Sequence, residues 1–494
     1  MADLNGVMLQ AFHWYSAADG THWDTLAARA TELARSGFTA LWLPPAAKGL
    51  GGASDVGYGV YDLYDLGEFD QHGSIRTRWG TRAQYLAALA ALRAAGLQVY
   101  ADVVLNHRIG ADAFERCEAT PYPRGDRLQP KGPPRTIRAH TRFTFPGRAG
   151  VYSDFTWNHR HFDAVDWDGD RPDERDTVHL LEGKRFDDAV STEFGNFAYL
   201  LGCDLDFQDP EVREEVTRWG RWMLDTTGVD GFRLDAIKHI SSWFFPEWLD
   251  AMERHARRDL FVVGEYWTDH RPTLQRYLDA VGGRMAVFDV PLHYRFHQAG
   301  RAGAAFDLRS VLEGSLVQAR PTQAVTFVDN HDSQPLQALE SPVEAWFKPL
   351  AYALILLRRE GYPCVFWADY LGADYEDLGH DGQRHRVTLP SHRFLLDRFL
   401  AARRDCAHGE QRDWFDHPNV IGWTRLGDAA HPRALAVLMS NGADGWKWME
   451  VARRNATFHD ITGHCCEPVC SNEDGWACFR CRGGSVSVWL EQPR

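Results

Sequence analysis

The stretch Gly231-Phe-Arg-Leu-Asp-Ala-Ile-Lys-His239 decides how the chain folds and where its chemistry lies. It ends an apolar run, so it is predicted to be a strand in which alternate side chains share a face. Arg233 and Asp235 then lie side by side, and a guanidinium attracts the ionised carboxylate that a nucleophile requires. The alternative is a buried Arg–Asp ion pair without a chemical role.

The composition is that of a large globular protein with a neutral partner. The chain has 494 residues, of which 44% are hydrophobic, enough for a substantial core and more than one domain. Its formal net charge is -14, which disfavours a nucleic-acid partner and suits an uncharged substrate. No apolar run is long enough to span a bilayer, so no membrane partner is expected. We expect a monomer.

The first residues carry neither the charged nor the apolar segment of a signal peptide. This favours a cytoplasmic protein. A secreted mature chain that has lost its signal peptide is the alternative.

Strands and helices alternate along most of the chain. Strands are predicted at 7–14, 40–43, 98–105, 229–235, 260–265, 286–290, 324–328 and 364–367. Helices are predicted at 25–36, 82–95, 211–226, 243–256, 272–280 and 343–359. Helices between strands imply right-handed crossovers and a parallel sheet. Eight such units indicate an α/β protein with a (β/α)₈ TIM barrel.

The alternation is interrupted once and then ends. Residues 106–207 show little helical period and are too many for a bare loop, so they are predicted to form an inserted β-rich subdomain after the third strand. Short alternating strands follow the barrel, and 401–494 are predicted to form a C-terminal β sandwich. The barrel is therefore expected to comprise 1–105 and 208–400.

Acidic residues recur at the predicted ends of the barrel strands. Asp102 ends the third strand, Asp235 the fourth and Glu265 the fifth, while Asp332 follows the seventh. In such a barrel the C-terminal strand ends build the active site. Their convergence on one rim favours catalysis over a structural ion pair.

Four sequence blocks resemble the α-amylases of the large retaining α-glucosidase superfamily, glycoside hydrolase family 13. They are Asp102-Val-Val-Leu-Asn-His107, Gly231–His239, Gly264-Glu-Tyr-Trp267 and Phe327-Val-Asp-Asn-His-Asp332. Further matches extend over nearly the whole chain, and the liquefying bacterial endo-α-amylases are the most similar members. The family's barrel, inserted domain and C-terminal β domain agree with the order predicted above.

The resemblance implies a role for each of these residues. Asp235 would be the nucleophile, Glu265 the general acid/base and Asp332 the partner that stabilises the transition state. Glu265 stands between apolar and aromatic residues, and desolvation there should raise its pKa. The implied substrate-binding residues are Trp14, Tyr58, His107, Arg233, Lys238, His239 and His331.

The resemblance also implies calcium, a hard cation that takes oxygen ligands. One set of matching positions is Asn106, Asp204 and the carbonyl of His239. A second cluster maps to Asp163, Asp187 and Asp206. One family carboxylate falls on Ala198, so this chain lacks a charged ligand and its calcium affinity should be weaker.

Five of the nine cysteines lie close together near the C-terminus: Cys465, Cys466, Cys470, Cys478 and Cys481. The spacing of Cys478 and Cys481 is that of a zinc knuckle, and the other three could complete four thiolates. On a strand, however, an odd separation puts these two on opposite faces. Free thiols are therefore favoured over structural zinc.

The predicted function is endo-hydrolysis of α-1,4-glucosidic bonds in starch, glycogen or maltooligosaccharides by a retaining double displacement. A maltooligosaccharide-forming exo-amylase or a transglycosylase would keep the same three carboxyl groups. A non-catalytic glucan-binding protein is a third alternative, which the intact Asp235, Glu265 and Asp332 disfavour.

Overall fold

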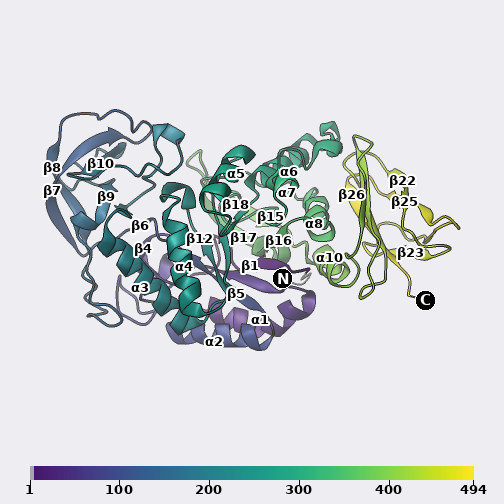
Figure 1. The fold of residues 1–494 in the computed structure, drawn as a ribbon, viewed down its shortest axis with the longest axis horizontal. Helices are drawn as coiled ribbons and strands as arrows, with labels where there is room; N and C mark the ends of the chain where they lie inside the picture. Colours follow the sequence, from purple (N-terminus) through teal and green to yellow (C-terminus); the bar gives the residue numbers. More distant parts are fainter. Residues whose placement is uncertain (1–4, 494) are drawn as a thin grey trace.

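Eight parallel strands close into a barrel at the centre of the computed structural model, which describes residues 5–493 (Figure 1). Around the barrel the strands are β1 (Met8–Gln10), β16 (Tyr362–Phe366), β15 (Ala324–Phe327), β14 (Ala286–Phe288), β13 (Phe261–Gly264), β12 (Gly231–Leu234), β5 (Gln98–Val103) and β2 (Ala40–Leu43). The predicted (β/α)₈ class is confirmed. Residues 1–4 and 494 of the predicted domain ranges lie outside the described residues.

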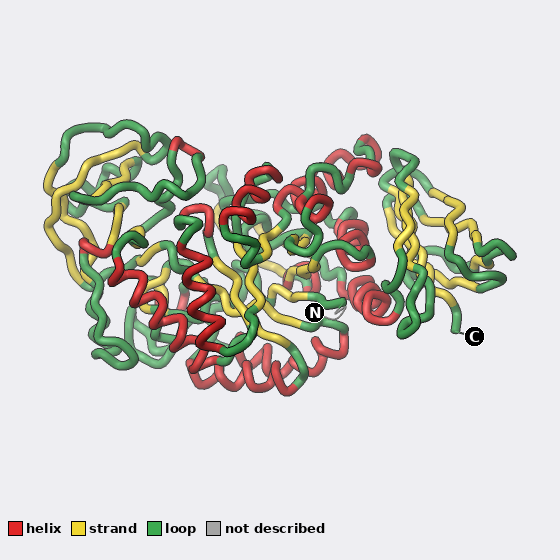
Figure 2. Tube along the Cα trace, viewed as in Figure 1, coloured by secondary structure: helices red, strands yellow, loops and turns green. Residues whose placement is uncertain are grey.

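Helices surround the barrel strands, as the red and yellow segments of Figure 2 show. They are α1 (His22–Ser36), α2 (Arg82–Ala94), α3 (Pro210–Thr227), α4 (Phe244–Ala256), α5 (Arg271–Ala280), α6 (Val290–Ala302), α7 (Leu316–Ala319), α8 (Lys348–Leu357), α9 (Trp367–Leu371) and α10 (Arg393–Asp405). The helix predicted at 343–359 is shorter than expected. The residues before α8 are not helical, because the Val343 N–H donates to the Asp329 carboxylate instead of to a helical carbonyl. A proline in the first turn marks where the helix begins.

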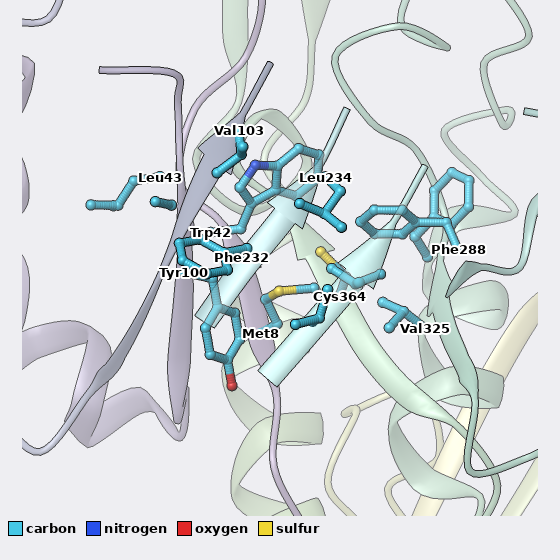
Figure 3. Close-up of a cluster of buried hydrophobic side chains, with 14 of the residues drawn as sticks. Met8, Trp42, Leu43, Tyr100, Val103, Phe232, Leu234, Phe288, Val325 and Cys364 are labelled. Atoms are coloured by element: carbon cyan, nitrogen blue, oxygen red, sulfur yellow. The ribbon is translucent and has the colours of Figure 1, made fainter. Parts of the chain in front are cut away.

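Large apolar side chains from different strands fill the barrel. Met8, Trp42, Tyr100, Phe288 and Cys364 are buried and meet in the cluster of Figure 3. Burying one such side chain contributes about 1.5–3 kcal/mol, so this cluster is a main source of stability. The Trp42 indole N–H also donates to Asp102 Oδ2 over 2.9 Å, which couples the apolar core to the carboxyl end of the barrel.

The segment between β5 and α3 forms a sheet of its own at one end of the molecule (Figure 1). Its strand order is β6 (His107–Arg108), β11 (Cys203–Leu205), β9 (Phe162–Val165), β10 (Thr177–Leu181), β7 (Ala113–Pro123) and β8 (Arg135–Arg142). Because β11 pairs with β6, Asp204 lies opposite His107. This pairing brings the C-terminal end of the inserted segment back to the rim of the barrel.

The C-terminal part is all-β and lies at the other end of the molecule (Figure 1). One sheet has the order β19 (Gln411–Trp414), β20 (Val420–Arg425), β21 (Leu435–Ser440), β26 (Ser485–Glu491), β23 (Thr457–Asp460) and β24 (Val469–Cys470), and a ribbon pairs β22 (Gly445–Glu450) with β25 (Trp476–Cys481). The predicted boundary at 401 falls inside α10, which packs against α8 on the barrel. A hairpin, β17 (Ala373–Leu378) with β18 (Arg384–Leu389), follows the last barrel strand.

Gly231 pairs with Phe261 of β13 at the start of β12. A Cβ at this residue would lie 2.0 Å from the carbonyl oxygen of Phe261, a backbone atom that cannot rotate away. We expect Gly231→Ala to lower the free energy of unfolding by about 1–3 kcal/mol, the usual cost of overpacking. Urea denaturation measures this change. Gly125→Ala is the control, since a Cβ there meets nothing within 4 Å; equal unfolding midpoints for the two variants would contradict the prediction.

Candidate active site

A single guanidinium joins the carboxyl groups of three neighbouring strands. Arg233 Nη1 donates to Asp102 Oδ1 over 2.9 Å and to Asp235 Oδ1 over 2.6 Å, while its Nη2 donates to Glu265 Oε2 over 2.9 Å. The sheet register causes this arrangement, because Arg233 lies opposite Asp102 on β5 and Val263 on β13. Asp235 and Glu265, predicted from distant parts of the sequence, thus meet at one cation.

Arg233, which is predicted to be a substrate-binding residue, is fully covered by the protein. Its side chain is 0% exposed, beneath the carboxyl groups. The guanidinium also lies over the ring of Trp42, 4.9 Å from its centroid. Substrate binding by Arg233 therefore stays a prediction, and in the structure its side chain contacts the carboxyl groups that it positions.

The backbone after Asp235 turns so that the N–H of Ala236 points to the carboxyl group of Glu265. Ala236 has φ 50°, in the left-handed region that residues with a Cβ rarely adopt. This conformation directs its N–H to Glu265 Oε2 at 3.1 Å. Oε2 therefore accepts two hydrogen bonds, which leaves Oε1 as the oxygen of Glu265 that is free to carry a proton.

Burial controls the protonation of Glu265. Desolvation raises the pKa of Glu265 to about 7, against the attraction of Arg233 and with further repulsion from Asp235. Burial likewise raises the pKa of Asp102 to about 6. Asp235 and Glu265 are each 9% exposed, so both keep a small contact with solvent. Such a site holds a proton on Glu265 near neutral pH, as general acid catalysis requires.

Asp332 belongs to the same group of charges. Burial raises its pKa, and Glu265 and Asp235 add repulsion, which places the three carboxyl groups within electrostatic range of one another. His331 Nε2 lies 3.3 Å from Asp332 Oδ2, and its Nδ1 lies 3.0 Å from Gln10 Nε2. With Gln10 donating to Nδ1, the ring proton sits on Nε2 and points to Asp332.

Three flat side chains form one wall of the site. The ring of Tyr58 is nearly parallel to those of Trp14, 5.9 Å away, and His331, 5.0 Å away. The Tyr58 hydroxyl donates to Asp102 Oδ2 over 2.8 Å. His107 Nε2 lies 2.8 Å from the carbonyl oxygen of Tyr58, so its proton is engaged within the protein and holds Tyr58 in place.

Lys238 and His239 lie on the turn after β12 and contact the inserted segment. Lys238 Nζ lies 3.1 Å from both carboxylate oxygens of Glu193 and donates to the carbonyl of Trp267. His239 Nδ1 lies 2.7 Å from the carbonyl oxygen of Phe197. Burial lowers the pKa of His239 to about 3, so the ring is neutral.

Sequence reasoning missed several residues of the site. Gln10 and Trp42 are polar contacts at strand ends, and their position at the carboxyl edge of the barrel is the signal that could have identified them. Glu193 and Phe197 lie in the insertion, where no periodic pattern assigns a position. Only the folded chain brings them to Lys238 and His239.

The predicted calcium ligands gather where the insertion meets the barrel. Burial and mutual repulsion raise the pKa values of Asp163, Asp187 and Asp204, and Asp206 contributes to each. Lys184 pairs with Asp206. Lys184 and Arg185 attract Asp163, and Arg127 attracts Asp204, yet the pKa of both carboxyl groups stays raised. Four buried carboxyl groups close to one another are an arrangement that fits a divalent cation. Ala198 is buried and its N–H donates to Asn196 Oδ1, so it supplies no charged ligand.

The carboxyl groups of this cluster are nevertheless spread out. Among the described residues, the only set of three or more His, Cys, Asp or Glu side chains with ligand atoms all within 4.8 Å is His408, Asp428 and His431. The two imidazole rings of that set stack with centroids 3.6 Å apart and planes 9° apart. Lone pairs in parallel planes do not converge on one ion, so the set is not a preformed metal site.

The cysteines near the C-terminus do not form the zinc site considered from the sequence. No three of their sulfurs meet the same 4.8 Å limit within the described part of the chain, and all five are free thiols. Cys481 is buried whereas Cys478 is partly exposed on the same strand. The odd separation puts them on opposite faces, as the strand geometry predicts.

Comparison with known proteins identifies the family. Residues 24–386 match the family described as alpha amylase, catalytic domain, and residues 435–490 match the alpha-amylase C-terminal domain. The chain belongs to the alpha-amylase family. Its resemblance to these glycoside hydrolases is thereby confirmed.

Curated relatives of this family match almost the full length. The chain is 49% identical over 492 residues to an alpha-amylase of Geobacillus stearothermophilus, covering 99% of this chain and 87% of that protein. It is 47% identical to the glucan 1,4-alpha-maltohexaosidase of Bacillus sp. (strain 707), covering 99% and 93%. It is 46% identical to the cytoplasmic alpha-amylase of Escherichia coli (strain K12), covering 98% and 99%.

A solved structure shares the fold. The crystal structure of alpha-amylase from Geobacillus thermoleovorans complexed with acarbose matches with a TM-score of 0.66 at 17% identity, over 99% of this chain and 98% of that chain. In the described residues, no helix has both the length and the apolar character needed to cross a membrane.

The raised pKa of Glu265 predicts an alkaline limit to activity. A general acid must be protonated in the free enzyme, so kcat/KM should fall as pH rises through the Glu265 pKa of about 7. The measurement is kcat/KM for a soluble maltooligosaccharide between pH 5 and pH 10, with melting curves as the control for unfolding. A profile that stays level up to pH 9 would rule out this assignment.

Proposed function

We propose that this protein hydrolyses internal α-1,4-glucosidic bonds of starch, glycogen and maltooligosaccharides with retention of configuration. The observation that carries the proposal is the shared hydrogen bonding of Asp235 and Glu265 to Arg233, with Asp332 alongside. Two carboxyl groups on one guanidinium are close together. Retaining glycosidases keep theirs about 5–5.5 Å apart, so that the second group attacks the sugar directly.

The hydrogen bonds assign a task to each oxygen. Asp235 Oδ1 is held by Arg233, so Oδ2 attacks the anomeric carbon and forms the glycosyl–enzyme bond. Glu265 Oε2 is held by Arg233 and Ala236, so the proton on Oε1 passes to the departing glycosidic oxygen. Glu265 then removes a proton from water, which attacks the anomeric carbon and releases Asp235.

The surrounding side chains bind the sugar that reacts. Asp332 and His331 hydrogen-bond its hydroxyls, and these bonds strengthen as the ring flattens toward the oxocarbenium-like state. Tyr58 and Trp14 offer flat faces to the rings, and His107 fixes Tyr58 from behind. Lys238 and His239 border the leaving-group side. Arg233 acts through the carboxyl groups.

One relative favours a second candidate. The 47% identical protein from Bacillus sp. (strain 707) is named for releasing maltohexaose. The same carboxyl groups can serve endo-cleavage, release of one oligosaccharide of fixed length, or glycosyl transfer. Chromatography of the products from soluble starch separates these outcomes. A broad ladder means endo-hydrolysis, one short product means release of fixed length, and lengthened chains mean transfer.

Asp235→Asn tests the mechanism. Loss of the nucleophile should reduce kcat on soluble starch at least about 10³-fold, the scale seen when a covalent nucleophile is removed. Release of reducing ends is the measurement. Asp225→Asn, at an exposed acid on α3 that pairs with His255, is the control and should keep full activity. Turnover by Asp235→Asn comparable to that of the control would exclude the proposed role.

The same reasoning extends to calcium. Asn106, Asp204 and the carbonyl oxygen of His239 would hold one ion, and Asp163, Asp187 and Asp206 would extend the site toward the insertion. The ion would neutralise buried carboxylates and tie the insertion to the barrel. Support comes from the burial of Asp163 and Asp204, which together with repulsion from the neighbouring acids raises the pKa of both carboxyl groups.

Chelation tests this cation. With a calcium chelator the melting temperature should fall, because an ion bound only to the folded state at 100 times its Kd stabilises by about 2.7 kcal/mol. Added calcium should restore it. Asp204→Asn should melt at the same temperature with and without chelator. A wild-type melting temperature that does not respond to chelator would refute the calcium site.

We also propose that the protein acts as a monomer in the cytoplasm on uncharged glucan. The E. coli relative of similar length carries the word cytoplasmic in its name. The net charge of -14 suits a neutral polymer better than a polyanion.

A further inference from the structure

The hairpin of β17 and β18 is held to the rim of the barrel mainly by one side chain. Each of its strands has six residues, all of them described, and Tyr375 is the only one of these residues that is buried. The other face of the hairpin is solvated, with the exposed Arg386 paired to Asp374. Tyr375 is therefore the residue whose contacts fix where the hairpin lies.

Tyr375 connects the hairpin to two other loops. Its ring lies flat on that of Tyr15, which follows β1, with centroids 4.0 Å apart and planes 13° apart. Its hydroxyl donates to the carbonyl oxygen of Pro335, which follows β15, over 3.0 Å. The Tyr15 hydroxyl in turn accepts from Gln337 Nε2 over 2.7 Å. The two tyrosines thus hold residues 335–337 in place, and we call this arrangement the tyrosine clamp.

The clamped segment has a strained backbone. Leu336 has φ 71°, in the left-handed region that residues with a Cβ rarely adopt. Such a conformation persists only where the surrounding structure enforces it. The carbonyl oxygen of Leu336 lies 3.4 Å from the Tyr15 hydroxyl, which donates to it. The conformation of residues 335–337 therefore depends on the clamp.

The clamp adjoins the flat wall of the active site. Trp14, whose ring is parallel to that of Tyr58, precedes Tyr15 in the chain. The Trp14 N–H donates to Gln334 Oε1 over 3.1 Å, so the wall and the clamped segment are joined directly. Pro335 and Leu336 are only partly buried, and their apolar surface suits the apolar face of a sugar ring.

The turn that carries Asp332 is held independently of the clamp. Asn330 Oδ1 accepts from the N–H groups of Asp332 and Ser333, over 3.0 Å and 2.8 Å. The Asn330 N–H donates to Ser333 Oγ over 3.0 Å, which closes the turn. Loss of the clamp should therefore displace residues 335–337 and leave the carboxyl group of Asp332 in place.

The strand order places the clamp across the barrel from the leaving-group side. Its three loops follow β1, β16 and β15, which are neighbours in the barrel. Lys238 and His239 follow β12, which lies four of the eight places away from β16. Loops after parallel strands share one rim, so the hairpin and Lys238 lie on opposite sides of its mouth. The clamp is thus on the glycone side, where the part of the glucan that keeps the reacting sugar would lie.

We propose that Tyr375 is a positioning residue that sets how many glucose units are bound on the glycone side, and with it the length of the oligosaccharides released. This inference rests on the proposed function and deepens it. Tyr375 acts through Tyr15 and residues 335–337, which bind units beyond the reacting sugar. A short substrate that does not reach this segment gains nothing from the clamp.

Tyr375→Ala tests the clamp by removing both the stacked ring and the hydroxyl. KM and kcat are measured on the series from maltotriose to maltoheptaose. KM for maltoheptaose should rise at least about threefold with kcat unchanged, the result expected when uniform binding is lost. Both constants on the shortest substrate that is cleaved should stay at the wild-type values. Chromatography should show that the products of soluble starch become shorter on average.

Two further variants and melting curves accompany this measurement. Asp374→Asn changes an exposed residue of the same strand and is the control, with wild-type KM on every substrate. Tyr375→Phe keeps the stacked ring and loses the bond to Pro335, so KM for maltoheptaose should rise in the same direction but by less. If melting curves show that Tyr375→Ala is unfolded, Tyr375→Phe becomes the test.

Three outcomes would count against these conclusions. A wild-type KM for maltoheptaose in every folded Tyr375 variant would overturn the clamp. An equal loss of kcat/KM on short and long substrates would also overturn it, because Tyr375 would then have a structural role alone. If the wild-type protein cleaves no maltooligosaccharide, the proposed function itself is refuted.

Discussion

The hydrogen bonds of the buried Arg233 guanidinium are the interaction on which the site depends. A fully buried cation is tolerated only with partners, and Asp102, Asp235 and Glu265 provide them. Removing one member of such a buried ion pair typically costs about 3–5 kcal/mol. The register of β5, β12 and β13 must therefore be kept, and with it the spacing of the carboxyl groups. The arrangement that holds these strands in register is the one that positions the chemistry.

The apolar core of the barrel extends directly to the carboxyl groups of the active site. Trp42 packs against Phe288 inside the barrel, lies under Arg233 and donates to Asp102. Tyr58 donates to the same carboxyl group from the other side. The resulting layer excludes water beneath Asp235 and Glu265, which is the physical cause of the raised pKa of Glu265. A more open barrel end would leave Glu265 ionised and would supply no proton.

The sequence predicts what is encoded locally and misses what depends on distant contacts. The alternation of strands and helices predicts the barrel, and the acidic residues at strand ends predict that Asp235, Glu265 and Asp332 belong to the site. The burial of Arg233 could not be predicted in this way, because it depends on two neighbouring strands and on Trp42. The same holds for Glu193 and Phe197, which reach Lys238 and His239 only through the folded insertion. The length of α8 was overestimated because a tertiary hydrogen bond to Asp329 holds the segment before it.

The left-handed backbone at Ala236 has a consequence for the intermediate of the reaction. In the proposed mechanism Glu265 becomes an anion once it has given up its proton, and its Oε2 already faces an N–H group and a guanidinium. Hydrogen bonds to a charged acceptor are roughly twice as strong as those between neutral groups. The hydrogen bond from the Ala236 N–H to Glu265 is therefore strongest halfway through the proposed cycle, when the glycosyl group is attached to the protein. It favours the deprotonated carboxylate at the moment when a base is needed to activate water.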